Sequence, residues 1–402
     1  MNGILFGVPF YLTVPTRFLS ANSGIFTWMV SSQIEDLKTP GLILDVARVR
    51  SNAARVSAIV EKHGVRLRPH IKTHKSVEIA KIQTEGHSGA VTVSTLAEAK
   101  AFAAAGFSDF TYSVPIEPGK FSEVFELLRS GVKVNVVTDD PDIPDLLNRA
   151  ANAARVSVSV FLEVDCGDHR SGVDPNSAAA ASIPRLISDA SNLDFAGILT
   201  HGGHSYDTTT LDEIKAIARQ ERDVMVELAE RLRADGIELP TISIGSTPTI
   251  THADDLSGID EVRPGNYILY DAFQATIGSC SFDDCALTIL AAIVHRGSDK
   301  IIVDAGAIAL SKDRGPVDRD ADCGYGRVLD LTGNDLGLRV AGVSQEHGVI
   351  RVADKSLLEK LKVGDRVRVL ANHSCISAAQ HTHYNVLENG KIVDKWQIHR
   401  GW

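Results

Sequence analysis

Short apolar runs alternate with longer segments of helical period between about residue 46 and residue 270. Continuous apolar runs separated by helices are typical of a parallel sheet that is covered on both faces. The eight predicted strands are residues 65–72, 90–93, 110–113, 132–137, 156–164, 193–200, 241–245 and 261–269. The predicted helices between them include residues 76–83, 95–105, 120–130, 142–153, 176–190 and 210–234.

Eight strand–helix units of this length predict an α/β fold whose N-terminal part is a (β/α)8 barrel of the TIM type. A doubly wound open sheet is the alternative arrangement. The glycine-rich pattern GxGxxG, which follows the first strand of dinucleotide-binding sheets, does not occur at that place. Its absence there favours the barrel.

The pattern changes after about residue 276, where strand-like runs follow one another without a long amphipathic helix. These runs are CALTILAAIVHR, DKIIVDAGAIALS, LRVAGVSQEHGVIRV, DRVRVLANHSC and THYNVLENGKIVDKWQIH. In the last of them Asn389 and Gly390 separate two apolar segments and predict a tight hairpin. We therefore expect an N-terminal extension (1–33), a barrel (34–275) and a mostly β domain (276–402).

The first 28 residues are apolar but are interrupted by Pro9 and Pro15, and they lack the positive region of a secretory signal. Because Met29 begins a segment that resembles an ordinary N-terminus, we expect either a loosely ordered extension or an upstream start that is not used. No apolar run in the chain reaches the ~18 residues that suggest a membrane span.

The net charge and the cysteine content limit the classes of binding partner and the cellular compartment that we expect. The formal net charge is -10, which disfavours a nucleic acid or an anionic membrane as a partner, because both attract a basic face. The cysteine count is five, an odd number, and no CxxC pair occurs. We therefore expect no disulfide framework and a reducing, cytoplasmic setting.

Active sites of such barrels lie at the carboxyl ends of the strands. The first predicted strand ends in RLRPHIKTHKS, where a desolvated Lys72 would have a lowered pKa and could act as a nucleophile or base. Lys72 and Lys75 could equally be surface lysines of a loop. The fifth ends in EVDCGDHRSGV, where Arg170 could bind a cofactor oxygen or only pair with Asp165 or Asp168.

Three further strand ends carry polar residues and glycines. HGGHSYD follows the sixth strand, and its histidines are more typical of loop or supporting residues than of metal ligands. GSTPT follows the seventh strand and RPGNYILYD contains the eighth. A phosphate site beside these last two loops is a recurrent barrel arrangement, although such short strings are common.

The motif ANHSC in the C-terminal domain places His373 and Cys375 two residues apart, so on a strand they would face the same side. Imidazole and thiolate are good zinc ligands, and two protein ligands would leave positions open for water or substrate. The alternative is a buried cysteine beside a core histidine.

Together, RPHIKTHK, EVDCGDHRSGV, HGGHSY, GSTPT, RPGNYILYD and NHSC resemble the fold-type III pyridoxal 5′-phosphate (PLP) enzymes related to alanine racemase. Within that family the chain is most similar to the D-serine dehydratase and D-threonine aldolase branch, over roughly residues 34–402. The resemblance implies a barrel, a C-terminal β domain and a head-to-tail homodimer. It implies Lys72 as the Schiff-base lysine and Arg170 beside the cofactor's phenolate oxygen. The residues that it implies for holding the ring and phosphate are Tyr206, Ser246, Thr247, Gly265 and Asn266.

The same resemblance implies that His373 and Cys375 bind a divalent metal. Dehydratases of this branch carry HxC and its aldolases typically carry HxD, so Cys375 favours a dehydratase, and its thiolate favours Zn²⁺. The expected substrate is a D-3-hydroxy amino acid such as D-serine, converted to a 2-oxo acid and ammonia. The alternatives are an aldolase, a racemase and a PLP-binding protein without catalysis. Leu199 stands where the family would have a tyrosine, about seven residues before Tyr206.

Overall fold

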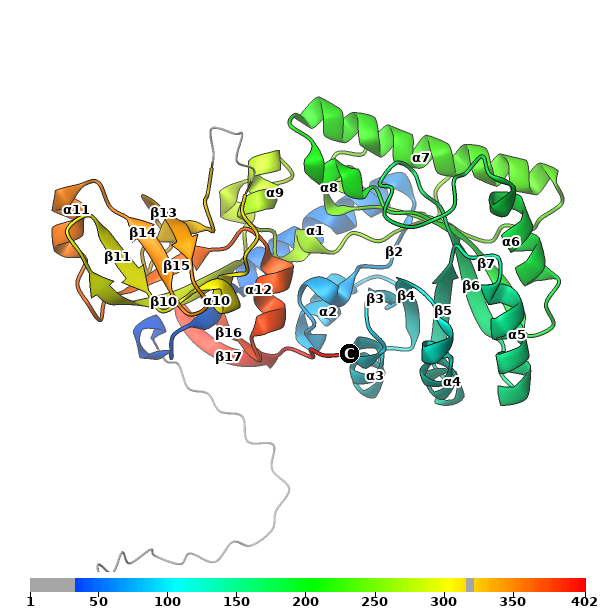
Figure 1. Cartoon of the computed structure of the whole chain (residues 1–402), viewed down its shortest axis with the longest axis horizontal. Coiled ribbons are helices and arrows are strands. Elements are labelled where there is room, and N and C mark those ends of the chain that lie inside the picture. Colours follow the sequence, from blue (N-terminus) through cyan, green and yellow to red (C-terminus); the bar gives the residue numbers. More distant parts are fainter. Residues whose placement is uncertain (1–32, 316–321) are drawn as a thin grey trace, which may run out of the picture.

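The computed structural model describes residues 33–315 and 322–402, and almost all of the expected N-terminal extension lies outside these ranges. Figure 1 shows two parts side by side, a helix-covered parallel sheet and a smaller part rich in antiparallel strands. Among the described residues, no helix combines the length and the apolar character needed to cross a bilayer.

The N-terminal part is an eight-stranded parallel sheet in the order β2-β9-β8-β7-β6-β5-β4-β3. Its strands are β2 (Arg66–Leu67), β3 (Val91–Val93), β4 (Asp109–Pro115), β5 (Lys133–Thr138), β6 (Val158–Glu163), β7 (Leu193–Leu199), β8 (Ile242–Ile244) and β9 (Glu261–Val262). The edges meet where His70 bridges Thr92 and the Thr92 N–H donates to the Pro69 carbonyl at 2.9 Å. The predicted barrel fold is therefore confirmed, and each predicted strand has its counterpart.

The first and last barrel strands are much shorter than predicted. Proline has no backbone N–H and interrupts a sheet, and Pro69 and Pro264 follow β2 and β9 closely. Beyond them the chain forms 3-10 turns at Ile71–Thr73 and Asn266–Ile268. Lys72 therefore lies in a turn after the strand rather than at the tip of the strand.

Helices cover the outside of the barrel, and the six predicted ones begin and end within about two residues of expectation. They are α2 (Val77–Gln83), α3 (Leu96–Ala104), α4 (Phe121–Arg129), α5 (Ile143–Ala154), α6 (Ala178–Ser188) and α7 (Leu211–Ala234), with α1 (Val46–His63) and α8 (Thr247–Thr251) in addition. Local sequence fixes several ends. In α7 the Thr210 side chain accepts from the backbone N–H of Glu213, whose carboxylate reaches back to the Thr210 N–H, a capping box.

The C-terminal part is a nine-stranded sheet in the order β11-β14-β13-β12-β15-β10-β1-β16-β17, and β10 also pairs with β11. Its strands are β1 (Gly41–Asp45), β10 (Leu287–Arg296), β11 (Lys300–Val303), β12 (Arg327–Leu329), β13 (Asp335–Val343), β14 (Gly348–Arg351), β15 (Arg366–Leu370), β16 (His383–Glu388) and β17 (Lys391–Gln397). Only short helices accompany them: α9 (Ala272–Ile277), α10 (Ala307–Leu310), α11 (Lys355–Lys360) and α12 (Ser374–Gln380). The predicted hairpin joins β16 to β17, with positive φ at Asn389 (50°) and Gly390 (76°).

Strand β1 departs from the expected division at residue 275. The range 34–275 assigns it to the barrel, but β1 pairs antiparallel with β10 and parallel with β16 in the C-terminal sheet. The chain then enters α1, where the Asp45 carboxylate caps the helix by accepting from the N–H groups of Ala47 and Arg48. The largest apolar core includes buried residues of both parts, and each part has a smaller cluster besides it.

Candidate active site

A cavity of about 980 Å³ lies at the carboxyl ends of the barrel strands and is closed from the other side by the C-terminal part. This volume is at the upper end of the range for small-molecule sites. The residues that the family resemblance implies for the site all line it: Lys72, Arg170, Tyr206, Ser246, Thr247, Gly265, Asn266, His373 and Cys375. Residues separated by up to 303 positions are thus brought to one place, while their individual chemical roles remain predictions.

The turn that carries Lys72 is fixed by His70. The Lys72 N–H donates to the Nδ1 atom of His70 at 3.3 Å, and the Nε2 atom of the same ring lies 3.1 Å from the Ser113 hydroxyl. The Lys72 amine can be reached from the cavity yet is enclosed by protein. That enclosure is the main cause that lowers the pKa of the amine. The charge of Cys375 raises this pKa and the charge of Arg170 lowers it, and the net shift is downward. A lowered pKa makes the neutral, reactive amine more abundant.

Lys75 differs from Lys72 although both belong to the same motif. Its ammonium forms an ion pair with the fully buried Glu98, and Lys75 does not line the cavity. Its backbone has a positive φ of 51°, which turns the chain away after the Ile71–Thr73 turn. Of the two lysines in this motif, only Lys72 therefore offers its amine to the cavity, which Lys312 of the C-terminal part also lines.

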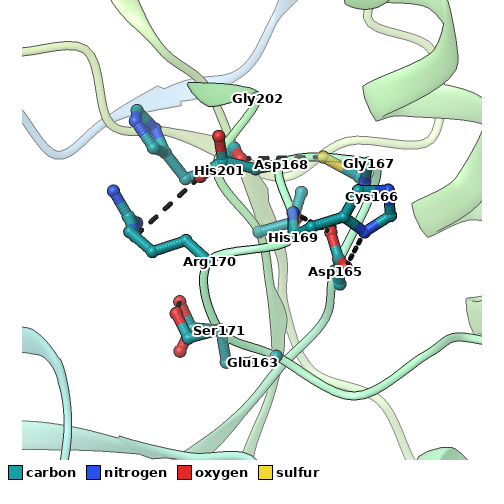
Figure 2. Close-up of polar contacts among 12 residues, drawn as sticks. Glu163, Asp165, Cys166, Gly167, Asp168, His169, Arg170, Ser171, His201 and Gly202 are labelled. Carbon is teal, nitrogen blue, oxygen red and sulfur yellow. Dashed lines mark hydrogen bonds and ion pairs between the residues drawn. The ribbon is translucent and has the colours of Figure 1, made fainter. Parts of the chain in front are cut away.

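The loop after β6 presents Arg170 to the cavity. Figure 2 shows Arg170 and the ring of His169 extending from opposite sides of this loop. The Asp165 carboxylate holds the loop by accepting from the N–H groups of Gly167 (2.8 Å) and His169 (3.0 Å). Arg170 meets Asp168 only at 3.8 Å and its side chain is 59% exposed, so this pair is weak. The guanidinium is therefore available to a ligand, and its binding to a cofactor oxygen stays a prediction.

Tyr206 and His201 lie in the loop after β7 and line the cavity. The Tyr206 hydroxyl is in hydrogen-bonding reach of the Thr247 backbone, and burial raises the pKa of the phenol. Burial, aided by the positive charges of Lys72 and Arg170, lowers the pKa of His201 to about 3. His201 is therefore a neutral ring near neutral pH. Leu199, at the position where the family would have a tyrosine, also lines the cavity.

Hydroxyl groups in the predicted phosphate loops are already used within the protein. Ser246 is the N-cap of α8, and its hydroxyl accepts from Thr249 N–H at 3.3 Å. The Thr247 hydroxyl accepts from the Tyr267 N–H at 3.1 Å. A Cβ on Gly265 would lie 2.9 Å from the His70 carbonyl oxygen, so glycine is needed where this loop touches the Lys72 turn. The backbone of these loops is thus what a ligand would meet first.

The side chain of Asn266 points to the C-terminal part. Its amide donates to Asp271 at 2.7 Å and to Ser374 at 3.1 Å, whereas its Oδ1 atom is buried without a partner. Asp271, which the sequence did not single out, also accepts from the Ser374 N–H at 3.0 Å. This small network joins the eighth barrel loop to α12.

His373 and Cys375 do not lie on a strand, so that expectation is wrong. Strand β15 ends at Leu370; His373 then caps α12 and Cys375 lies in its first turn, because the chain turns into a helix after Asn372. The two side chains nevertheless interact, and Cys375 Sγ lies 3.3 Å from the Thr73 hydroxyl. Since Thr73 adjoins Lys72, one chain suffices to bring the thiol to the Lys72 turn.

Electrostatics favour a thiolate at Cys375. Burial alone would raise the pKa of this thiol, but the neighbouring His373 more than offsets burial and lowers it. Asp313, which no sequence signal indicated, contacts the Nδ1 atom of His373 at 2.5 Å. A carboxylate on one ring nitrogen that leaves the other free is the usual support of a metal-ligating histidine. No group of three or more metal-ligating side chains occurs in residues 33–315 and 322–402, so these two ligands would leave open positions.

Two family models match the chain. The model of the alanine racemase N-terminal domain matches residues 44–272, and that described as "Putative serine dehydratase domain" matches residues 286–387. D-threo-3-hydroxyaspartate dehydratase of Delftia sp. (strain HT23) is 37% identical, over 91% of this chain and 98% of that protein. D-serine dehydratase of Dictyostelium discoideum is 34% identical, over 92% of this chain and 99% of that protein. D-threonine aldolase of Arthrobacter sp. is 28% identical over 90% of this chain and 92% of its own length.

The solved structure of the Delftia dehydratase has a TM-score of 0.89 to this chain at 36% identity, over 92% of this chain and 100% of that one. A variant of that dehydratase is known in a metal-free form, which implies metal binding in the family. The likeness extends over both the barrel and the C-terminal sheet. Because the first family model covers more than half of the sequence, the chain belongs to the alanine racemase family of fold-type III PLP enzymes.

Proposed function

We propose that this protein is a PLP- and metal-dependent dehydratase that converts a D-3-hydroxy amino acid to a 2-oxo acid and ammonia. The observation that carries the proposal is the meeting of an accessible, enclosed Lys72 with the His373 and Cys375 pair in one cavity, through the Thr73–Cys375 contact. The relatives at 34% and 37% identity are dehydratases, whereas the aldolase is at 28%.

The residues present fit PLP. The cavity offers the Lys72 amine with its lowered pKa, an available guanidinium at Arg170 and the buried Oδ1 atom of Asn266, which has no partner. When bound, the cofactor supplies an electron sink for charge developed at the substrate α-carbon. Lys72 would hold it, and Tyr206, Ser246, Thr247, Gly265 and Asn266 would surround its ring and phosphate.

The donor set at His373 and Cys375 fits a soft divalent ion such as Zn²⁺. Such an ion supplies Lewis acidity to a hydroxyl group. The Asp313 carboxylate fixes the orientation of the His373 ring, and Thr73 fixes the Cys375 thiol. These contacts would hold the two ligands in place before any ion arrives.

Lys72 would also move the proton. Enclosure lowers the pKa of its amine, so that the free amine can accept a proton from the substrate α-carbon. Neutral His201 also lines the cavity and adds no positive charge that would lower the basicity of Lys72 further. Loss of hydroxide from the β-carbon would then give a product that hydrolyses to the 2-oxo acid and ammonia.

The test is a panel of D-serine, D-threonine and D-threo-3-hydroxyaspartate, each incubated with the PLP-loaded protein with and without a chelator. A 2-oxo acid and ammonia, formed only without the chelator, are the expected products. Glycine with an aldehyde would show an aldolase, and an inverted amino acid would show a racemase. PLP binding without turnover of the panel would contradict the proposed function.

We also propose that the protein is a homodimer, and light scattering would measure its mass in solution.

A further inference from the structure

Glu221 lies in the middle of α7 and its side chain is completely buried. One carboxylate oxygen, Oε1, accepts from the Gly202 N–H at 2.7 Å and from the Gly245 N–H at 3.0 Å. We propose that Glu221 is a positioning residue that fixes the loops after β7 and β8 in the register needed to bind the cofactor phosphate and ring. The inference rests on the proposed function, because it concerns the same cavity.

The two glycines belong to the segments that carry the predicted cofactor contacts. Gly202 directly follows His201 and precedes Tyr206, whereas Gly245 directly precedes Ser246 and Thr247. The hydroxyl of Tyr206 is also in reach of the Thr247 backbone. Moving either loop would therefore shift residues on both sides of the proposed cofactor site.

Both backbone positions are shaped for this contact. A Cβ on Gly202 would lie 3.1 Å from the Glu221 carboxyl carbon, so the missing side chain lets the carboxylate approach the N–H. Gly245 has a φ of 117°, a conformation that other residues rarely adopt. A single oxygen thus joins two turns, one of which requires the positive φ of Gly245.

If residue 221 only packed α7 against the core, an apolar side chain would be buried there at a lower cost in free energy. Other buried positions on α7, including Met225 and Leu228, are apolar and belong to the core. Burying a carboxyl group costs free energy unless hydrogen bonds compensate. Besides the two backbone N–H groups, the Glu221 carboxylate interacts with the Thr249 side chain. Burial accordingly raises the pKa of Glu221. This costly carboxylate stands at the position where its Oε1 atom accepts hydrogen bonds from two loops of the cavity.

The test compares four variants of the full chain by PLP dissociation constant and melting temperature. Glu221→Gln keeps a carbonyl oxygen that can accept both N–H groups, so its dissociation constant should stay within about threefold of the wild type. Glu221→Asp is one methylene shorter and Glu221→Ala has no acceptor, so both should bind PLP roughly tenfold more weakly or worse. Met225→Ala, one helical turn away and equally buried, is the matched control. It should lower the melting temperature while PLP affinity stays near the wild-type value.

Glu221→Ala is the variant most prone to unfolding, and the contrast between Gln and Asp tests the inference without it. Equal PLP affinity in the Gln and Asp variants, or equal weakening in the Asp variant and Met225→Ala, would overturn it. Hydrogen exchange at Gly202 and Gly245 gives a second readout, expected to be faster in the Asp variant than in Met225→Ala. If the wild type binds no PLP, the proposed function fails, and the exchange rates still decide whether Glu221 holds the two loops.

Discussion

At the scale of single residues, the local environment separates side chains that the sequence leaves equivalent. Lys72 and Lys75 belong to one motif, but only Lys72 faces the cavity, since Glu98 binds Lys75. The sequence could indicate the motif and the HxC pair, because both are local. It could not indicate Asp313 or Glu221, because their partners are distant in the chain and no spacing rule links them.

The lowered pKa of Lys72 predicts how the apoprotein takes up PLP. Only the neutral amine attacks the cofactor aldehyde, and a lowered pKa shifts the neutral fraction to lower pH. The rate of PLP uptake, followed by absorbance, should therefore rise with pH to a midpoint below the ~10.4 of an ordinary lysine. Lys81→Ala, at an exposed position that does not line the cavity, should keep this midpoint. A midpoint at or above the ordinary value would contradict the assignment of an enclosed amine.

Removing one of the two ligands should remove the metal. Cys375→Ala is expected to reduce bound zinc at least about tenfold and abolish dehydration, because His373 alone binds weakly. Elemental analysis of the purified variant measures the loss. Cys280→Ala is the matched control, since Cys280 does not line the cavity. Full zinc content in Cys375→Ala would place the ion elsewhere.

At the scale of elements, patterning located the barrel strands and helices but missed how several of them end. The strands before Pro69 and Pro264 are short because proline stops pairing, which the sequence does contain as a signal. The helical start at His373 was not foreseen, since the apolar run of β15 continues up to it. The sequence also does not indicate which strands pair with β1, because its residues, GLILD, have the same apolar character as a barrel strand.

The β16–β17 turn provides an element-scale test. Gly390 has a φ of 76°, so Gly390→Ala should lower the free energy of unfolding by about 1 kcal/mol. Gly342→Ala is the control, because Gly342 is a strand glycine without a positive φ and with open space at its Cβ position. Denaturant titration measures both variants. Equal stability of the two would mean that the hairpin turn does not require glycine.

At the scale of the whole molecule, the C-terminal part completes the site. The Tyr384 hydroxyl donates to the His74 carbonyl at 2.7 Å, and the His399 N–H donates to the Lys75 carbonyl at 2.7 Å. Together with the Thr73–Cys375 contact, these bonds hold the Lys72 turn from outside the barrel. The two parts of the chain therefore contact each other directly at the Lys72 turn.

A chain cut after residue 275 should not yield a functional barrel. The cut removes both partners of β1 and exposes Leu42, Ile43 and Leu44, which are buried in the full chain. We expect aggregation and loss of PLP absorbance, measured by light scattering and spectroscopy beside the full chain. A monodisperse fragment that binds PLP with full affinity would show that the parts are independent.

The most direct test of the account is borohydride reduction of the PLP-loaded protein, which fixes the cofactor covalently to its lysine, followed by peptide mapping. The account predicts that the cofactor mass is found on Lys72 and is absent from that peptide when D-serine or D-threo-3-hydroxyaspartate has displaced the lysine before reduction. The cofactor mass on any other lysine, including Lys75 and the cavity-lining Lys312, would contradict the account.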